Sequence, residues 1–433
     1  MILFRKRLSL LVIVFLVLIP LITWGQVDGD YQTIATSDWN NNNTWQVYNS
    51  GAWNPCGVGD YPGATAGAGT VYITGDNTVS VTADVSNSIG ALTFVGANAS
   101  NIVQFSGSYI LNITGGVTIN PPTVGPANNN GIYVNSGIVT CATLTSSNSN
   151  NDTKDTKVVI STGGLTVNGD IVMGINAIRN DITFTGAGTL NVTGSLTTGQ
   201  LTCVNNSTIN IGGALTPTAF TISTSTVNFN GVNQNIPFYS YYNLFTSNGG
   251  IKTLADINYT VTGNMQISNS TLAFPSAQAR TLSVSGDLSG NGTIDMSPGN
   301  FTHTLNLGGS SNSIGTLTTA VAVLSTVNYN LAGDQVIFSS PNYKNLTISN
   351  GGNKTLGGDV TAGGTLTLSD GKVLLGAYDL TLSGTAAVSN VSSANYIVAV
   401  GSGQMKKVFA SGATAAYILP VGDATNYSPV SLT

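Results

Sequence analysis

The 433-residue chain contains no glutamate and a single histidine, and only 7% of its residues are charged. All 18 acidic residues are aspartates, and two stretches, residues 85–151 and 182–251, carry no charged side chain. Amphipathic surface helices therefore have few residues to form from. General acid–base catalysis uses His, Asp, Glu or Lys most often. Their scarcity disfavours an enzyme.

Cysteines are also few, with only Cys56, Cys141 and Cys203 in the chain. An odd number at wide spacing predicts neither a disulfide framework nor a metal motif. Cys141 and Cys203 each follow an apolar residue and a threonine, which favours two core positions. A disulfide between them stays open, because it requires Cα atoms within about 7 Å.

Ligands for a metal or cofactor are equally scarce. The lone histidine, His303, lies between two threonines in a strand-like run, where we expect an exposed side chain. Gly-Asp pairs such as Gly286-Asp287 recur, but they lack the nonapeptide spacing that binds calcium in β-rolls. Asp beside Gly is ordinary turn chemistry. We therefore expect no cofactor and no metal.

Long hydrophobic runs are absent after the N-terminus. Arg5 to Arg7 precede an apolar run, Leu8–Ile22, and Gly25 offers a small residue for cleavage. The run has about 15 residues, whereas a membrane-spanning helix needs about 20. Residues 1–25 thus read as a signal peptide. The mature chain would carry 10 basic and 18 acidic residues, which predicts secretion or a cell-surface location, no nucleic-acid partner and no membrane insertion after cleavage.

Glycine and short alternating runs are abundant. The chain has 52 glycines, and within residues 345–384 the apolar pair Leu346/Ile348 returns as Leu366/Leu368 and as Leu380/Leu382. Each unit is too small to bury its own apolar face, so such units become stable by stacking. We predict an all-β fold in which residues 71–395 form a right-handed parallel β-helix of about 13–16 turns, at about 20–25 residues a turn and one strand spacing per turn.

A longer repeat overlies the short one. Ser225–Asn230 returns 100 residues later as Ser325–Asn330, and Gly249–Leu254 returns 102 residues later as Gly351–Leu356. Two matches in register would rarely arise by chance. The array therefore contains a duplicated block of several turns.

Residues 26–70 contain all the tryptophans of the mature chain, Trp39, Trp45 and Trp53. A solenoid leaves its first core layer open, so we predict an N-terminal capping segment over residues 26–70. Clustered tryptophans could instead form a sugar-stacking platform, because an aromatic face suits the apolar side of a pyranose ring. Both interpretations of the three residues stay open.

The chain resembles adhesin-like surface proteins with β-helical repeats that Gram-negative bacteria export by the type IX pathway. Near the N-terminus, the resemblance lies in the spacing of Asp38-Trp39, Thr44-Trp45, Pro62-Gly63 and Val71–Ile73. Farther along, the stretches that carry it are Asn345–Ile348, Gly351–Leu356 and Leu374–Leu382. It implies a surface or extracellular protein. Residues 396–433 resemble the start of a β-sandwich in such proteins, and because the chain stops inside an alternating run we expect a fragment of a longer protein.

Secreted β-helices are often polysaccharide lyases or hydrolases, so an enzyme is the main alternative. Glycosidases need paired carboxylates about 5–10 Å apart. The densest charges, which would have to converge in one groove, are Asp152, Asp155, Lys157, Asp170, Arg179 and Asp181. A solvated loop explains them more simply.

We therefore expect a non-catalytic structural or adhesin-like rod that binds a polysaccharide or another cell-surface polymer, displays further domains, or self-associates through its Thr- and Ser-rich faces. The alternative is a polysaccharide-degrading or carbohydrate-binding β-helix protein.

Overall fold

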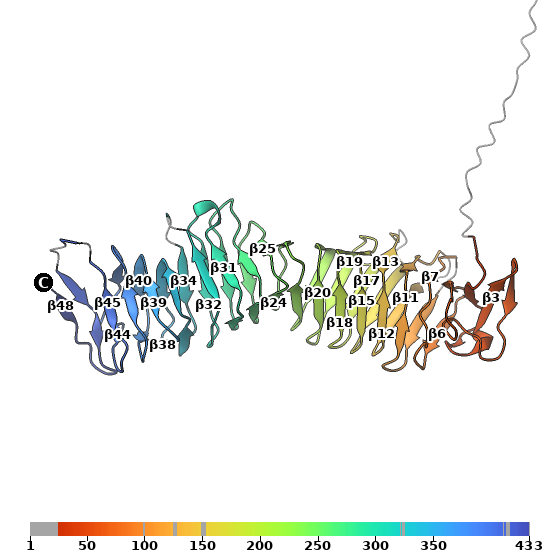
Figure 1. Ribbon diagram of the computed structural model, residues 1–433, viewed down its shortest axis with the longest axis horizontal. Helices are drawn as coiled ribbons and strands as arrows, with labels where there is room; N and C mark the ends of the chain where they lie inside the picture. Colours follow the sequence, from red (N-terminus) through yellow and green to blue (C-terminus); the bar gives the residue numbers. More distant parts are fainter. Residues whose placement is uncertain are drawn as a thin grey trace, which may run out of the picture.

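The protein is an elongated rod made of strands (Figure 1). The computed structural model describes residues 25–97, 100–123, 128–148, 153–320, 322, 325–409, 411–412 and 416–432. The predicted signal peptide lies outside them, apart from Gly25. The strands stack in parallel into a β-solenoid of about 15 turns, so the predicted parallel β-helix is confirmed.

Strands of the N-terminal half lie in three columns, here called stacks A, B and C, and each strand pairs in parallel with its equivalent one turn away. Stack A contains β5 (Thr70–Ile73), β7 (Ala91–Phe94), β10 (Gly116–Ile119), β13 (Thr143–Ser146) and β16 (Ile171–Val172). Stack B contains β2 (Ser37–Asp38), β6 (Thr78–Val81), β8 (Ile102–Phe105), β11 (Asn128–Asn135), β14 (Lys154–Ile160) and β17 (Asn180–Phe184). Two longer strands cross from stack A to stack B: β19 (Leu196–Cys203) and β21 (Leu215–Ile222).

Stack C runs through the middle of the rod. It contains β9 (Ile110–Asn112), β12 (Ile138–Cys141), β15 (Gly164–Val167), β18 (Thr189–Val192), β20 (Thr208–Ile211), β22 (Thr226–Phe229), β24 (Asn243–Thr246), β27 (Met265–Ile267) and β30 (Leu288–Ser289).

Four further columns, stacks D to G, build the C-terminal half. Stack D contains β23 (Gln234–Ile236), β25 (Ile251–Leu254), β28 (Thr271–Ala273), β31 (Thr293–Met296) and β33 (Thr316–Thr319). Stack E contains β26 (Tyr259–Val261), β29 (Thr281–Val284), β32 (Thr304–Leu307), β34 (Thr326–Tyr329), β37 (Asn345–Ile348), β40 (Thr365–Leu368) and β43 (Ala387–Ser389). Stack F contains β35 (Gln335–Ile337), β38 (Asn353–Leu356), β41 (Lys372–Leu374), β44 (Ile397–Val398) and β47 (Val421–Gly422). Stack G contains β36 (Ser340–Tyr343), β39 (Val360–Ala362), β42 (Leu380–Leu382) and β45 (Met405–Lys407).

Alternation along each strand sorts side chains between core and surface. In stack C, Leu165 and Leu190 are paired in register and fully buried. The residues between the buried ones face outward, and Asn210 donates through Nδ2 to Asn191 Oδ1 (2.8 Å) while Asn228 donates to Asn210 Oδ1 (2.9 Å). These outward amides form a ladder along the rod.

Turn length varies while the core register holds. In stack C, Val139 follows its partner Leu111 by 28 residues, whereas Leu244 follows Val227 by only 17. The connections between strands absorb the difference, so inward residues still lie over one another.

The N-terminal end is closed by an antiparallel segment. β1 (Tyr31–Thr33) pairs in parallel with β5, and β3 (Trp45–Asn49) runs antiparallel to both β1 and β4 (Ala52–Pro55). A single-turn 3₁₀ helix, η1 (Asn42–Thr44), precedes β3. The short β4 ends at a proline, which cannot extend the sheet further.

At the C-terminal end, parallel stacking continues past residue 395. β44 pairs with both β41 and β47, and β45 pairs with β42. The expected boundary between residues 395 and 396 therefore falls inside the β-solenoid, because strands beyond it still pair with those of the preceding turns. β46 (Tyr417–Leu419) and β48 (Val430–Leu432) form a separate antiparallel pair.

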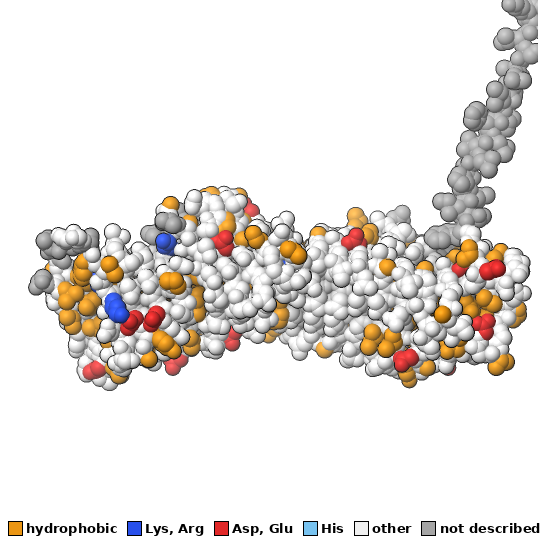
Figure 2. Space-filling model, in the orientation of Figure 1, with side chains coloured by type: hydrophobic (Ala, Val, Ile, Leu, Met, Phe, Trp, Pro, Cys, Tyr) orange, Lys and Arg blue, Asp and Glu red, His pale blue; other side chains and the backbone are white. Residues whose placement is uncertain are grey.

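The helices among the described residues are two short 3₁₀ turns, η1 and η2 (Pro298–Asn300). Within that part of the chain, no helix has the length and apolar character needed to cross a bilayer. In the face drawn in Figure 2, few atoms belong to charged side chains and most belong to neutral polar side chains, glycine or backbone.

Candidate functional site

The structure brings four of the six candidate charged residues together on the outward face of stack B. Asp155 and Lys157 lie on β14, Asp181 lies on β17 directly opposite Lys157, and Arg179 immediately precedes β17. Asp155 Oδ2 is 3.1 Å from Lys157 Nζ, and Asp155 Oδ1 is 3.0 Å from Arg179 Nη1. Both oxygens of this carboxylate are thus engaged by cations.

Asp181 differs from Asp155 in its surroundings. Its side chain is about nine-tenths buried, and Oδ1 has no hydrogen-bond partner among the described residues. Desolvation raises the pKa of the Asp181 carboxyl, while the charge of Lys157 opposes that shift. A carboxyl of this kind could donate a proton. In the Asp155 carboxylate beside it, each oxygen already has a cationic partner.

The other two candidates do not join this cluster. Asp170 precedes β16 in stack A, where Oδ1 accepts the backbone N–H of Ser195 (2.7 Å), so it stabilises a turn. Asp152 lies outside the described residues. The convergence that the enzyme alternative requires is therefore met by Asp155, Lys157, Arg179 and Asp181 and not by Asp170. Asp155 and Lys157 lie on a strand and are partly buried, so the simpler expectation of a solvated loop is wrong for these two residues.

The three cap tryptophans divide into two groups. Trp39 and Trp45 are 1% and 0% exposed, and their rings meet edge to face at 5.0 Å. Trp39 Nε1 donates to the Pro62 carbonyl (2.9 Å) and Trp45 Nε1 donates to the Trp39 carbonyl (2.7 Å). Both indoles close the core and cannot stack on a sugar.

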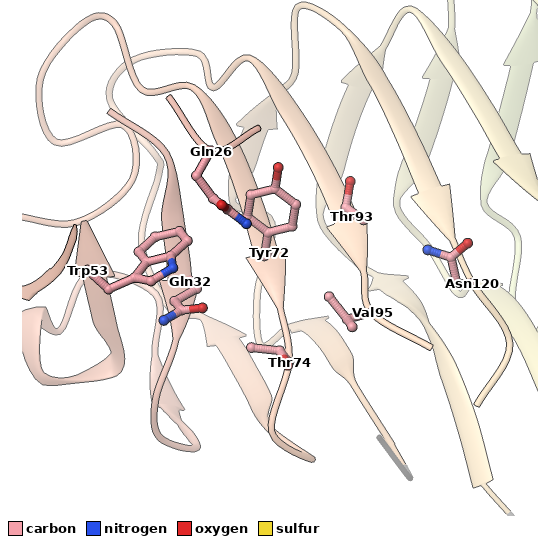
Figure 3. Close-up of a pocket in the computed structure, with 8 residues that line it drawn as sticks. All are labelled: Gln26, Gln32, Trp53, Tyr72, Thr74, Thr93, Val95 and Asn120. Carbon is pink, nitrogen blue, oxygen red and sulfur yellow. The ribbon is translucent and has the colours of Figure 1, made fainter. Parts of the chain in front are cut away.

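Trp53 is only half-buried and borders a groove on the outward face of the cap and stack A (Figure 3). The groove, here called the cap groove, encloses about 290 Å³. It is lined by Gln26, Gln32, Trp53, Tyr72, Thr74, Thr93, Val95 and Asn120. None of these side chains carries a charge.

Strand register sets the floor of the cap groove. Gln32, Tyr72 and Thr93 are direct neighbours on β1, β5 and β7. Thr93 is only 6% exposed and lies next to Tyr72 on the neighbouring strand, whereas Gln26 and Trp53 lie on the Tyr72 and Gln32 side of the groove (Figure 3). Nothing in the sequence singled out Gln32, Tyr72 or Asn120. Their only sequence signal is that they occupy alternate, outward-facing positions in or beside a strand, which many other residues also do.

Neighbouring groups hold the groove side chains in place. Trp53 meets Tyr48 at 5.2 Å and Tyr72 at 6.4 Å between ring centroids, both edge to face. Gln32 Nε2 donates to Gln46 Oε1 (2.9 Å). Burial, followed by the negative charge of Asp30, raises the pKa of the Tyr72 hydroxyl, so it stays protonated and able to donate a hydrogen bond.

His303 is buried, which contradicts the exposed strand histidine that we expected. Its Nδ1 accepts the backbone N–H of Arg280 (3.1 Å), and Nε2 lies 3.3 Å from the Pro298 carbonyl. These contacts fit a neutral ring protonated at Nε2. Desolvation lowers the pKa of His303 despite opposing contributions from backbone contacts and nearby aspartates. Its role is structural.

All three cysteines are buried free thiols, so Cys141 and Cys203 are not paired. Burial raises the pKa of each of these two thiols to about 12, which leaves them protonated and unreactive near neutral pH. Within the part of the chain that the structure describes, no group of three or more His, Cys or Asp residues could hold a metal ion.

Comparison of the chain with protein-family models, with curated proteins and with solved structures finds no match.

Proposed function

We propose that the mature chain is a secreted or cell-surface rod of the adhesin-like kind, which binds a polysaccharide or another surface polymer without cleaving it. The observation that carries the proposal is the use of charge. In the one dense charged cluster among the described residues, Asp155 is bound by both Lys157 and Arg179. Its ions neutralise one another and leave no matched acid and base for hydrolysis.

The outward faces support binding. In stack E, the residues in register on β29, β32 and β34 are Ser283, Asn306 and Asn328, all neutral and polar. Asn306 Nδ2 donates to Ser283 Oγ (3.1 Å), and Asn328 Nδ2 donates to Asn306 Oδ1 (3.2 Å). Such rows of oriented amides and hydroxyls offer hydrogen bonds along the rod to a polymer or to a second copy.

The cellular location rests on the sequence. The basic, apolar and small residues of segment 1–25 have the order of a secretion signal. The acidic mature chain suits neither nucleic acid nor an anionic membrane surface. A rigid rod of stacked turns could also hold further domains away from a cell.

Incubation of residues 26–433 with neutral and acidic polysaccharides, with and without Ca²⁺, tests the proposal. We expect retardation of the protein in gels that contain a bound polysaccharide, without release of reducing or unsaturated ends. The proposal fails if the protein binds none of the polymers and fractionation of cells leaves it in the cytoplasm.

A polysaccharide lyase or hydrolase is the second candidate, and the raised pKa of the nearly buried Asp181 favours it. Product release that disappears in Lys157→Ala or Asp181→Ala would establish this alternative. Asp170→Ala is the matched control, because Asp170 lies apart from the cluster and caps a turn.

A further inference from the structure

We propose that the cap groove is a binding subsite for a neutral saccharide chain, with the indole of Trp53 as its stacking platform. This inference rests on the proposed binding function and assigns it one place and one class of ligand. It depends on the aromatic groups, the polar groups, the charge and the length of the groove.

The aromatic groups are arranged as a supported platform. Trp53 is partly exposed, whereas the other two tryptophans of the mature chain are buried. T-shaped contacts with Tyr48 and Tyr72 restrict the orientation of the indole, and part of its surface stays exposed. A fixed aromatic face loses little entropy when it stacks on the apolar side of a sugar ring.

Amides and hydroxyls surround this platform. Gln32 is oriented by its hydrogen bond to Gln46, and Asn120 Nδ2 donates to the Phe94 carbonyl (3.0 Å). Tyr72 supplies a protonated hydroxyl and Thr93 lies on the floor. A few oriented polar groups beside an apolar surface are typical of small-molecule sites, and this combination matches the hydroxyls and C–H faces of a sugar.

Charge selects a neutral ligand. No lining residue is charged. Residues 26–123 include six aspartates and neither lysine nor arginine. A saccharide that carries carboxylate or sulfate groups would be repelled by this field and would find no cation to pair with.

The length of the groove favours a chain over a single sugar. From Trp53 on β4, the sheet continues through β3, β1, β5 and β7 to β10, and Asn120 follows β10 directly. Because the Trp53 ring reaches to 6.4 Å from the Tyr72 ring on β5, and β10 lies two strand spacings beyond β5, the lining side chains span about 16 Å. Several consecutive sugar units would contact the lining residues at once.

Tryptophan fluorescence of residues 26–433, tagged at the C-terminus, tests the proposal. Because Trp39 and Trp45 are buried, iodide quenching in this chain reports mainly on Trp53. The probes are soluble laminarin, xyloglucan and mannan as neutral polysaccharides, and alginate and polygalacturonate as acidic ones. At least one neutral probe should protect Trp53 from iodide, and the acidic probes should not.

Affinity gels with the same probe then compare variants. We expect Trp53→Ala to weaken binding at least about 10-fold, as for a residue at the centre of an interface. Trp53→Phe should retain part of the affinity and checks against misfolding. Tyr378→Ala, an exposed aromatic residue far along the rod, should bind like the unmodified chain.

Three results would overturn the assignment. If Trp53→Ala binds neutral polysaccharide as tightly as the unmodified chain, the ligand binds elsewhere on the rod and only this subsite is wrong. If only acidic polysaccharides bind, the argument from charge is wrong. If a proline-rich peptide protects Trp53 from iodide and the saccharides do not, the groove binds peptide. If the unmodified chain binds none of the polymers, the result would instead contradict the proposed function itself.

Discussion

The turns that start at Ser225 and at Ser325 are two copies of one sequence block, and the polar groups around one buried aromatic corner have different partners in the two copies. Some contacts are shared. Gln234 in the first copy and Gln335 in the second each donate through Nε2 to two backbone carbonyls of the preceding turn. These shared contacts fix the corner between stack C or E and the next column.

The second copy contains a buried pair of tyrosines. Tyr343 donates to the Phe338 carbonyl (2.8 Å), and its hydroxyl lies 2.7 Å from that of Tyr329. The Tyr329 hydroxyl in turn accepts the backbone N–H of Phe338 (3.1 Å). Every polar group in this set therefore has a partner.

The first copy lacks two members of that set at once. Phe229 replaces the tyrosine, which removes the hydroxyl, and Pro237 replaces Phe338, which removes the backbone N–H. Tyr241 still donates to the Pro237 carbonyl (2.7 Å). A donor and its acceptor are missing together, so neither copy leaves an orphaned group here. Duplicated turns diverge in complete sets because a lone buried donor is costly.

Each copy also buries a lysine. Lys252 Nζ donates to the carbonyls of Gly231, Val232, Ser247 and Gly249, and Lys354 Nζ donates to those of Leu331, Gly333 and Gly351. Desolvation lowers the pKa of both ammonium groups. For Lys354, the charges of Asp334 and Asp370 oppose that shift.

The largest effect should come from removal of these lysines. Lys252→Met and Lys354→Met each leave three or four turn carbonyls without a donor, which we expect to cost about 3 kcal/mol. Because turns of a solenoid contact only their neighbours, the loss should stay near the substituted copy. Hydrogen exchange followed by mass spectrometry should show faster exchange in residues 231–254 for the first variant and in residues 331–356 for the second.

The carbonyl groups around Lys252 and around Lys354 are here called the two cages. Lys344→Met is the control, because Lys344 is partly exposed and lies outside both cages. Exchange that accelerates equally in both copies after either substitution would contradict the local picture. Stability equal to that of the control would show that the cages contribute nothing.

Tyr329→Phe should have the next largest effect. It gives the second copy the aromatic ring of the first but leaves the Phe338 N–H buried without an acceptor, and we expect a loss of about 2 kcal/mol. Urea denaturation followed by near-ultraviolet circular dichroism would measure it. Tyr378→Phe, on an exposed tyrosine, controls for loss of a hydroxyl as such. An unchanged midpoint would mean that water reaches Phe338, and the argument from paired divergence would fail.

Much of this architecture could be predicted from the sequence. The alternation in Leu346/Ile348 and Leu366/Leu368 gave their inward orientation, and both pairs are buried and in register. The matches at 100 and 102 residues identified the duplication. Glycine pairs indicated turns, and Gly250 and Gly352 adopt positive φ of 63° and 69° where a Cβ would meet the backbone one turn below.

The remaining features depend on contacts that periodicity does not encode. Charge alone would place Lys252 and Lys354 on the surface, although period-two parity with Leu254 and Leu356 places them inward. The cap tryptophans look alike in sequence. Only the fold shows that Trp39 and Trp45 are buried while Trp53 borders a groove.

The copies should also differ in their response to acid. One turn before each copy, the same inward position holds Ser207 in the first case and His303 in the second. The pKa of folded His303 is lowered by desolvation, and Asp256 and Asp295 only partly oppose this. The unfolded chain therefore binds the extra proton more readily, and stability should fall as pH drops below about 6.5 toward the folded pKa.

Thermal unfolding between pH 7.5 and 5 would measure this response. His303→Gln should flatten the pH dependence, and hydrogen exchange should place the acid-sensitive region around residues 280–326 instead of 207–229. Equal sensitivity of both regions would contradict the assignment to His303.

The smallest effect should come from one carboxylate. Asn233 Oδ1 accepts the Ile251 N–H (2.9 Å) in the first copy, and Asp334 Oδ1 accepts the Asn353 N–H (2.8 Å) in the second. Substitution of asparagine by aspartate, or the reverse, keeps this hydrogen bond and changes only the charge near the buried lysine. We expect Asn233→Asp to stabilise the first copy, and Asp334→Asn to destabilise the second, by about 0.5 kcal/mol, since both side chains are exposed and screened.

Salt and pH separate this charge effect from packing. The effect of each substitution on stability should shrink at 1 M salt, where the screening length is about 3 Å. It should also shrink as pH rises through the lowered pKa of the folded lysine, because a neutral amine no longer attracts the carboxylate. In the Lys252→Met background Asn233→Asp should give no stabilisation. A benefit that persists there would show that the introduced carboxylate acts on the turn backbone and not on the buried ammonium, and the two cages would then be electrostatically equivalent.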